Sequence, residues 1–362
     1  MSLKILHVVE AFGGGVFNSV KNICNYLSDY KHIILYGIRK ETPNNFEKFF
    51  KKNTSFIYWQ HSIREVNFIK DKMAAIYLSK IYKLTKPDII HLHSSKAGYL
   101  GRIVSTLMGL HKITLYSPRG LAFLQVTEPI YKRVSYMIAE KILGKLPCKI
   151  IACSKSEAKE LNKIGVKVYK IINNGIKVLC QPIPKFKKAD NLTIGTVGRI
   201  TAPKNPVLFN KIASFFSNRR NIKFIWIGDG ELRNLLTSPN IYITGWLDKN
   251  KVFSYIQKLD IFIMTSLWEG LPLAGIEALA VGKPLVVSNS CGCVDLVKEG
   301  INGYICNSFK TFISSIENLI LQPELRYKFS INSQKIYKEN FTLEKTIKEW
   351  KLLYEKVANN KY

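Results

Sequence analysis

The sequence predicts an α/β protein built from two Rossmann-like domains. Short apolar strands alternate with longer amphipathic helices along the chain, a pattern typical of parallel sheets covered by helices. The alternation breaks in a proline- and lysine-rich segment around residues 180–190 and then begins again. The 362 residues suffice for two domains that each bury a core of their own.

Individual strands are predicted from short apolar runs, and helices from apolar residues that recur every three or four positions. The expected strands of the first half are Lys4–Val9, Ile33–Tyr36, Ser55–Tyr58, Ile89–His91, Ile113–Tyr116, Ile150–Cys153 and Val168–Ile172, with helices such as Val16–Leu27 and Ile69–Leu84 between them. Those of the second half are Leu192–Val197, Lys223–Ile227, Ile241–Thr244, Ile261–Met264 and Pro284–Val287.

These elements predict an amino-terminal domain over residues 1–180, a linker over 181–190 and a carboxyl-terminal domain over 191–340. Residues 341–362 have an amphipathic pattern, and we expect them to form a helix that packs back on the amino-terminal domain. In such a pair of domains the ligand is expected at the carboxyl ends of the parallel strands, between the two sheets.

Charge and cysteine content narrow the possible classes of protein. The net charge is +28, from 54 basic and 26 acidic residues, which indicates a nucleic acid, an anionic membrane or a phosphorylated substrate as partner. Genomic base bias also produces lysine-rich chains, so charge alone does not identify the partner.

The seven scattered cysteines favour a reducing cytosol. No apolar run approaches the ~18 residues of a membrane span, and the amino terminus is expected to be a strand, not a signal peptide.

The most informative segment is Glu269-Gly270-Leu271-Pro272-Leu273, followed by Glu277. It passes from an apolar strand through a Gly/Pro turn into a helical pattern. One carboxylate can therefore stand in the loop while the other points from the helix towards the same space. Free N–H groups at the helix start suit a diphosphate, and carboxylates beside them suit sugar hydroxyl groups. Two unrelated acids on a solvated helix face are the alternative.

Two glycine-containing turns supply further candidates. Gly198-Arg199 ends the first strand of the second half, and Lys204 follows five positions after Arg199. An arginine fork and a lysine point charge together suit two adjacent phosphates. Gly13-Gly14-Gly15 follows the first strand of the chain and lets the backbone approach a ligand closely. A tight strand-to-helix turn explains this second motif equally well.

These segments together resemble the retaining GT-B glycosyltransferases of family 4, also called glycosyl transferases group 1. The glutamates match the E-x7-E signature and Gly198–Lys204 matches the G-R-x4-K pattern, and the resemblance covers nearly the whole chain. It implies a GT-B fold, with two Rossmann-like domains facing across a cleft. It implies that Arg199 and Lys204 hold the donor diphosphate, Glu269 the sugar and Glu277 the ribose. The other donor-binding residues that it implies are Gly14, Gly15, Gly198, Trp246, Leu247, Gly270, Leu271, Pro272 and Leu273. For Trp246, a place in the core is the alternative.

The segment His91–Arg102 resembles the H-x-H-S-S-K-A-G-x-x-G-R run of family members that build bacterial capsule and O-antigen chains. This resemblance implies that Lys96 and Arg102 meet an acceptor diphosphate. Ser94 and Ser95 are expected to cap the helix start and leave its N–H groups open to the ligand. Alternatively, the two histidines of the run merely alternate with apolar residues on a buried strand.

The segment Tyr116-Ser117-Pro118-Arg119-Gly120 departs from the family. Many members have a histidine at the position of Arg119, proposed to face the donor sugar. An arginine cannot act as a general base at neutral pH, but it can stabilise phosphate or hydroxyl groups. We therefore keep Arg119 beside Glu269, Arg199 and Lys204 as a catalytic candidate.

Metal ions and cofactors are not expected. The sequence has no D-x-D motif and no acidic cluster with the spacing of a Mg²⁺ or Mn²⁺ site. Cationic side chains and helix ends would then stabilise the leaving group, as in the metal-independent GT-B pattern that the resemblance implies.

The segment Pro129–Lys149 has the pattern of a basic amphipathic helix, with apolar residues at Ile130, Val134, Met137, Ile138 and Ile142. Such a helix can lie on an anionic membrane, although a solvated face over an ordinary core is the alternative. A second basic patch, with Phe46, Phe49 and Phe50, lies within residues 39–52. We expect a cytoplasmic protein that is peripheral on the inner face of a bacterial plasma membrane.

The sequence therefore predicts a retaining glycosyltransferase of the hexosyl or N-acetylhexosaminyl class. Its donor is expected to be a nucleotide sugar, in particular a UDP-sugar. The acceptor is expected to be a polyprenyl-diphosphate-linked sugar or a glycan in capsule, O-antigen or lipopolysaccharide biosynthesis. One alternative is a nucleotide-sugar epimerase of the same architecture. Another is a non-enzymatic nucleic-acid-binding protein, but the aromatic residues interleaved with basic ones that it requires do not occur.

Overall fold

The computed structural model describes residues 2–39, 41–63, 65–178, 182–184, 186–188 and 191–359. The chain divides into two compact units. The amino-terminal unit comprises residues 1–124, 129–174 and 344–362, and the carboxyl-terminal unit comprises 125–128 and 175–343. Of the linker expected at 181–190, residues 181, 185, 189 and 190 lie outside the described residues.

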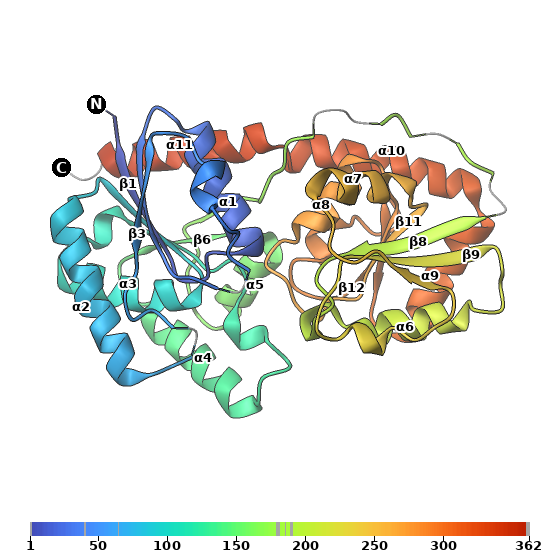
Figure 1. The fold of residues 1–362 in the computed structure, drawn as a ribbon, viewed down its shortest axis with the longest axis horizontal. Coiled ribbons are helices and arrows are strands. Elements are labelled where there is room, and N and C mark those ends of the chain that lie inside the picture. The colour runs from blue at the N-terminus through green and yellow to red at the C-terminus, as the bar shows by residue number, and fades with distance from the viewer. Residues whose placement is uncertain are drawn as a thin grey trace. The chain divides into compact units, whose positions relative to one another are not determined.

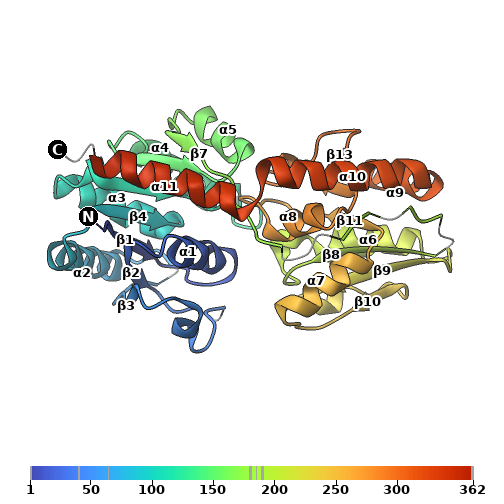
Figure 2. The ribbon, with the colours of Figure 1, turned by 90° about the horizontal axis from the view of Figure 1, so that it is seen from above.

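The amino-terminal unit is built on a parallel sheet of seven strands in the order β3-β2-β1-β4-β5-β6-β7 (Figures 1 and 2). The strands are β1 (Lys4–Val9), β2 (Lys31–Tyr36), β3 (Thr54–Tyr58), β4 (Ile89–His93), β5 (Thr114–Ser117), β6 (Lys149–Ala152) and β7 (Lys170–Ile171). The strand order changes direction between β1 and β4. In open parallel sheets the carboxyl ends of the strands at such a switch point are where ligands bind.

Helices cover both faces of this sheet. In Figure 1, α2 (Phe68–Thr85), α3 (Ser95–Leu107) and α4 (Ile130–Leu143) lie below the sheet, and α1 (Gly14–Tyr26) and α11 (Leu343–Asn359) lie above it. The lower helices share a core with the strands that contains Leu78, Val104 and Met137. The short helix α5 (Lys155–Lys163) begins at Ser154, whose side chain accepts a hydrogen bond from the Glu157 N–H, as expected of a serine cap.

The helix α11 is part of the amino-terminal unit although it follows the carboxyl-terminal unit in sequence. Its residues Trp350 and Tyr354 are buried. The Trp350 ring packs at 4.5 Å from the ring of His91 on β4, and the Tyr354 hydroxyl lies 2.7 Å from His91 Nδ1. The core of this unit therefore depends on residues from both ends of the sequence.

The carboxyl-terminal unit contains a second parallel sheet, of six strands in the order β10-β9-β8-β11-β12-β13. The strands are β8 (Leu192–Val197), β9 (Ile222–Ile227), β10 (Ile241–Ile243), β11 (Ile261–Met264), β12 (Leu285–Ser288) and β13 (Gly303–Cys306). The accompanying helices are α6 (Pro206–Phe215), α7 (Lys249–Lys258), α8 (Leu273–Ala280), α9 (Phe309–Leu321) and α10 (Pro323–Asn340). The order changes direction between β8 and β11.

These two parallel sheets confirm the predicted α/β class. The strands expected at Lys4–Val9, Leu192–Val197 and Ile261–Met264 occur with those bounds, and most others differ by one or two residues at an end. The edge strand β13 was missing from the sequence prediction. No helix in the described part of the chain is long and apolar enough to cross a bilayer.

Candidate active site

Most of the predicted donor residues lie at the carboxyl ends of β8 and β11, which are neighbours in the second sheet. Gly198 and Arg199 follow β8 directly, and Lys204 ends a short 3-10 helix, Ala202–Lys204. Glycine is required at Gly228, beyond β9, because its φ is 135° and a Cβ there would overlap the Gly198 carbonyl oxygen. The backbone turns after these strands are thus packed directly on one another.

Lys204 and Glu269 form an ion pair at this edge of the sheet. Lys204 Nζ lies 2.7 Å from Glu269 Oε1, and the two side chains are 21% and 18% exposed. The Ser266 hydroxyl donates to the same carboxylate oxygen at 2.9 Å. Burial acts to lower the pKa of the Lys204 ammonium, but the paired carboxylate outweighs it and the pKa is raised. A cation and a carboxylate are therefore held side by side, with solvent access to both.

The backbone around this pair is fixed by its own hydrogen bonds. The Thr265 hydroxyl donates to the Lys204 carbonyl oxygen at 2.8 Å, and the Leu267 N–H donates to the Pro203 carbonyl oxygen at 2.8 Å. The Glu269 N–H donates to the Cys291 carbonyl oxygen at 3.0 Å. The loop after β8 and the loop after β11 are thus tied together, which positions the ion pair.

The second glutamate stands on α8, as the sequence predicts. Glu277 is half-buried, and burial raises the pKa of its carboxyl group, an effect that Lys249 partly offsets. The N-cap residue Pro272 provides no side-chain hydrogen bond to the helix start. Leu271 and Pro272 are buried as whole residues.

Arg199 and Trp246 are exposed at the same end of this unit's strands. Trp246 follows β10 and its side chain is 68% exposed, which excludes the alternative of a core tryptophan. Leu247 beside it is half-buried. An exposed indole is available for stacking on a planar ligand.

In the amino-terminal unit, the glycine turn after β1 is open. The helix α1 begins at Gly14, two residues before the expected start, and Gly14 has a φ of 53°. Gly14 and Gly15 are both exposed, and a Cβ at either position would have no atom within 4 Å. The space beside the turn can therefore accept a ligand.

The two predicted acceptor residues have partners inside the same unit. Lys96 Nζ lies 2.6 Å from Asp71 Oδ1, and its side chain is 12% exposed. Arg102 is fully buried, with its Nη2 2.9 Å from Glu140 Oε1 and its guanidinium over the Tyr116 ring. The prediction that Arg102 contacts an acceptor is wrong, because Gly98 and Gly101 let the α3 backbone approach β4 and β5 and turn this side chain into the core. The predicted capping role of Ser94 is also wrong, since its hydroxyl makes no cap hydrogen bond.

Arg119 follows β5 in a left-handed backbone conformation, with a φ of 61°. Its Nη1 donates to Asn174 Oδ1 at 2.8 Å, and its guanidinium lies 5.9 Å from the centre of the Trp350 ring. Burial lowers the pKa of the guanidinium group. Its Nε and Nη2 atoms are buried without a hydrogen-bond partner in the described part of the chain.

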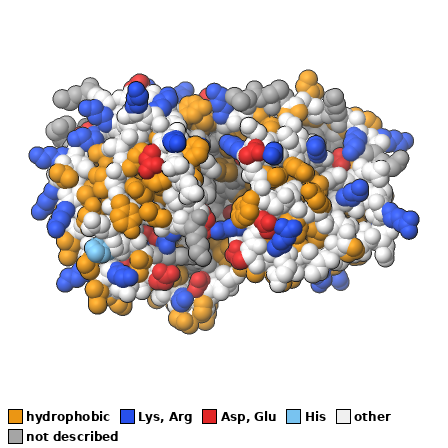
Figure 3. Space-filling model, viewed as in Figure 1, with side chains coloured by type: hydrophobic (Ala, Val, Ile, Leu, Met, Phe, Trp, Pro, Cys, Tyr) orange, Lys and Arg blue, Asp and Glu red, His pale blue; other side chains and the backbone are white. Residues whose placement is uncertain are grey.

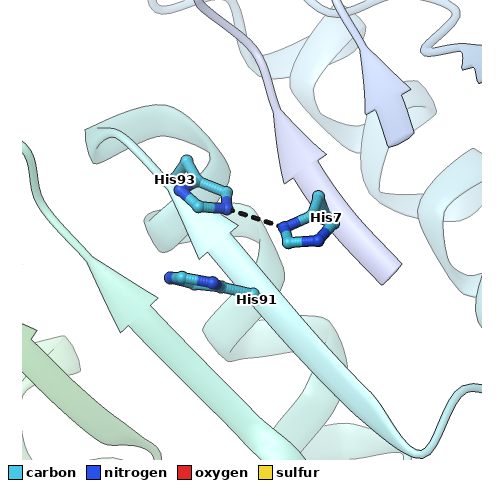
Figure 4. Close-up of side chains that lie close together, drawn as sticks. All are labelled: His7, His91 and His93. Carbon is cyan, nitrogen blue, oxygen red and sulfur yellow. Dashed lines mark hydrogen bonds between the residues drawn. The ribbon is translucent and has the colours of Figure 1, made fainter. Parts of the chain in front are cut away.

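The structural alternative for the histidines of β4 is confirmed, since His91 and His93 are fully buried. Together with His7 and His32 they form a connected group, of which Figure 4 shows His7, His91 and His93. Sequence reasoning also missed the side chains that hold the candidate residues in place, namely Asp71, Glu140 and Ser266. Of these only Ser266 has a signal in the sequence, because it lies between β11 and Glu269, three residues before the E-x7-E segment begins.

Comparisons with known proteins cover both units. Residues 13–178 match the family model of glycosyltransferase family 4, and residues 182–336 match that of glycosyl transferases group 1. The chain is 32% identical, over 82% of its length and 83% of the relative's, to UDP-Gal:alpha-D-GlcNAc-diphosphoundecaprenol alpha-1,3-galactosyltransferase of Escherichia coli. It is 27% identical, over 80% of its length and 82% of the relative's, to the capsular polysaccharide biosynthesis glycosyltransferase CapM of Staphylococcus aureus. A sucrose-phosphate synthase structure from Thermosynechococcus elongatus superposes with a TM-score of 0.82 at 15% identity, covering 98% of this chain and 99% of that one.

Proposed function

The chain belongs to the family 4 glycosyltransferases, which have the GT-B fold, and we propose that it transfers a hexose or N-acetylhexosamine from a UDP-sugar with retention of configuration. The acceptor in this proposal is a polyprenyl-diphosphate-linked sugar used in capsule, O-antigen or lipopolysaccharide assembly. Support comes from the donor and the acceptor in the name of the relative from Escherichia coli and from the capsular role of the relative from Staphylococcus aureus. The Lys204–Glu269 pair carries the proposal for the donor.

The donor diphosphate is assigned to the cations beside β8. Arg199 is exposed there and Lys204 is already oriented by Glu269. A diphosphate gains negative charge on its bridging oxygen as the sugar leaves, and fixed cations stabilise that charge. Glu269 would then accept hydrogen bonds from sugar hydroxyl groups and Glu277 from the ribose. The exposed Trp246 and its neighbour Leu247 would contact the base.

Retention is assigned to a front-face displacement that the leaving phosphate assists. Glu269 is paired with Lys204 and bonded to Ser266, which makes this carboxylate a hydrogen-bond acceptor for hydroxyl groups and a poor nucleophile. In the described part of the chain, the groupings of three or more potential metal ligands consist of buried histidines and a cysteine and contain no carboxylate. Such nitrogen and sulfur ligands do not suit Mg²⁺ or Mn²⁺, so we propose that transfer needs no divalent cation or cofactor.

The donor site is tested by removing its cations one at a time. Lys204→Met and Arg199→Met should each lower kcat by about 100-fold or more, because each removes charge stabilisation that grows in the transition state. Lys223→Met, at an exposed position on β9 of the same unit, is the matched control and should behave as the wild type. Full transfer activity in both Lys204→Met and Arg199→Met would refute this site. The donor sugar is identified beforehand by the UDP-sugar that raises the melting temperature most.

A membrane surface is proposed on the lower helices of the amino-terminal unit. On α4, Ile130, Val134, Ile138 and Ile142 recur every four residues and are 68%, 39%, 49% and 59% exposed. On α2, Phe68 and Ile69 are 89% and 74% exposed. Exposed lysines accompany both helices, and Figure 3 shows hydrophobic and basic side chains interspersed over this part of the surface.

An exposed apolar stripe beside basic residues fits an anionic bilayer better than bulk water. The stripe on α4 does not pack into a core, in contrast to the alternative of a solvated face over an ordinary core. The other patch considered in the sequence, within residues 39–52, is different, because Phe46 is buried among Phe12, Tyr36 and Phe56. We therefore propose that the enzyme acts at the inner face of a bacterial plasma membrane and docks through α2 and α4.

A further inference from the structure

The first turn of α2 presents two apolar side chains to solvent at the ligand-binding edge of the first sheet. Phe68 and Ile69 are both mostly exposed. Helix α2 packs beside α3 (Figure 1), and α3 begins two residues after β4 ends. Because β4 runs parallel to β1, the start of α3 lies at the carboxyl edge of this sheet, where ligands bind in such folds.

A lysine at the start of α3 holds the start of α2. Lys96 is the second residue of α3. Its Nζ lies 2.6 Å from Asp71 Oδ1, in the first turn of α2, and donates to the carbonyl oxygen of Glu65, just before that helix. The start of α2 is therefore fastened to the carboxyl edge of the sheet through Lys96.

The first turn of α2 also has hydrogen bonds of its own. The second carboxylate oxygen of Asp71 accepts from the Asn67 N–H at 3.2 Å. The Asn67 side chain in turn accepts from the Lys70 N–H at 3.0 Å. These bonds do not involve Lys96, so a loss of the Lys96–Asp71 contact would free the start of α2 from α3 without unwinding the helix.

The Lys96–Asp71 pair is accessible to a competing anion. The two side chains are 12% and 17% exposed, whereas neither side chain of the Arg102–Glu140 pair on the same helix is exposed. A partly exposed ion pair adds little net stability, because water and salt screen it. A diphosphate carries more negative charge than a carboxylate and can therefore replace Asp71 at Lys96.

The start of α3 offers further donors to such an anion. The cap residue Ser94 makes no side-chain hydrogen bond to the helix, and the first turn contains no acidic residue. The N–H groups of an uncapped first turn favour a phosphate group. A helix start alone does not make a site, but here the lysine of that turn already holds a carboxylate.

We propose that Lys96 binds the diphosphate of the lipid-linked acceptor and that Asp71 occupies the lysine until the acceptor arrives. When the diphosphate takes the place of the Asp71 carboxylate, the start of α2 is released, and Phe68 and Ile69 contact the polyprenyl chain. A nucleotide sugar has no such chain, so a cation beside exposed apolar side chains selects the acceptor over the donor. This inference deepens the proposed function and rests on it.

The first test measures binding and needs no sugar transfer. Farnesyl diphosphate is titrated into the protein in a calorimeter. Asp71→Asn keeps the size of the side chain but removes the competing charge, so it should bind about fivefold more tightly than the wild type. Lys96→Met should bind about tenfold more weakly, the effect of one lost bond to a charged group, and Lys96→Arg should bind as the wild type does. Glu349→Gln, which breaks the ion pair with Lys170 in the same unit, is the matched control and should leave the affinity unchanged.

The opposite signs of the Asp71→Asn and Lys96→Met effects distinguish an exchangeable pair from a structural one. If the pair only fastened α2 to α3, either substitution would break the same contact and both variants would change in the same direction. That result would overturn the proposal, and so would a wild type that does not bind farnesyl diphosphate.

Two further probes separate the polyprenyl chain and the membrane from the diphosphate. Phe68→Ser should weaken farnesyl diphosphate binding about tenfold and leave inorganic pyrophosphate binding unchanged, since pyrophosphate has no chain. Leu84→Ser, at a similarly exposed position at the other end of α2, is the control. Lys96→Met should bind phosphatidylglycerol vesicles as the wild type does. If it loses vesicles and farnesyl diphosphate equally, Lys96 serves the membrane surface and the proposal is wrong.

Kinetics then separate this proposal from the proposed function. With an N-acetylglucosaminyl-diphosphate lipid and the UDP-sugar identified by thermal stabilisation, Lys96→Met should raise the acceptor KM about tenfold and leave the donor KM unchanged. If the wild type transfers no sugar but binds farnesyl diphosphate through Lys96, the proposed reaction is wrong and the subsite stands. If transfer occurs and the acceptor KM does not respond to Lys96→Met, the reaction stands and the subsite is wrong.

Discussion

At the scale of single residues, burial separates cations that the sequence presents as equivalent. Lys204 lies just before α6 and Arg102 lies in the middle of α3, and each belongs to a motif that suggests phosphate binding. Lys204 pairs with Glu269 at a position open to solvent, whereas Arg102 pairs with Glu140 where neither side chain is exposed. A family motif gives the residue type and the spacing, but the direction of the side chain depends on how closely the helix approaches the sheet. Motif residues on α3 could therefore be predicted in position and not in role.

Arg102 should prove structural when it is replaced. Arg102→Met leaves the buried Glu140 carboxylate without its partner, and we expect a loss of about 3–5 kcal/mol in the free energy of unfolding. The double variant Arg102→Met/Glu140→Leu removes the stranded charge and should recover much of that loss. Urea unfolding followed by circular dichroism measures the free energy of unfolding of the single and the double variant. Normal stability of Arg102→Met together with a selective rise in acceptor KM would instead restore the acceptor role.

Ser266 is the residue that the sequence prediction of the donor site lacked. Its hydroxyl donates to Glu269 Oε1, so Ser266→Ala frees one lone pair of the proposed sugar-binding carboxylate and loosens its orientation. We expect about a fivefold rise in donor KM, which corresponds to about 1 kcal/mol, with little change in stability. Steady-state kinetics with the best UDP-sugar decides this, and Ser254→Ala on the exposed face of α7 serves as the control. An unchanged KM would mean that Glu269 does not need Ser266 for its orientation.

At the scale of helices and strands, the periodicity of apolar residues predicts where the elements lie, but it does not predict whether an apolar face of an element packs in a core or faces solvent. Strands β1, β8 and β11 were predictable because each is a short, mainly apolar segment that is largely buried within a parallel sheet. Strand β13 was not, because Gly303-Tyr304-Ile305-Cys306 is a short edge strand that begins with a glycine. Whether an apolar stripe faces a core or solvent cannot be read from its period, and α4 is the case in point.

The stripe on α4 should control membrane binding. Replacing Ile138 and Ile142 by Gln removes two half-exposed isoleucines, and we expect binding to vesicles of anionic phospholipid to fall about tenfold or more. Full burial of an isoleucine contributes about 1.5–3 kcal/mol, and each of these two side chains has only about half of its surface left to bury. Co-sedimentation measures this, with Val207→Gln on α6 as the control at a similar exposure. Binding should also weaken as salt concentration rises. If the α4 variant sediments as the wild type does, the membrane surface is elsewhere.

At the scale of the whole molecule, the buried histidines should make the amino-terminal unit sensitive to acid. Burial lowers the pKa of His7, His91 and His93, and that of His32 to about 4, whereas the unfolded chain keeps an ordinary histidine pKa of about 6.5. Below that pH the unfolded state binds more protons than the folded state. Stability is therefore full above about pH 6.5 and is lost as the pH falls.

The expected slope can be measured. Each histidine that stays neutral in the fold lowers the free energy of unfolding by about 1.4 kcal/mol per pH unit below pH 6.5. The contributions of the several buried rings add to one another. Thermal unfolding between pH 8 and pH 5 should show a flat upper region and a steep fall. The exposed His61 provides a matched control, since His61→Gln should leave the curve unchanged. A melting temperature that is constant down to pH 5 would contradict neutral buried rings.

The placement of α11 has a consequence for biosynthesis. Trp350 and Tyr354 close over His91, yet a ribosome makes β4 long before it makes them, with the entire carboxyl-terminal unit in between. During translation, part of the apolar surface of the amino-terminal sheet therefore stays uncovered until α11 has been made. The carboxyl-terminal unit can therefore complete its folding before the amino-terminal unit does, which reverses the usual order of domain folding during synthesis. Chaperones would have the longest time to bind the amino-terminal unit while it is incomplete.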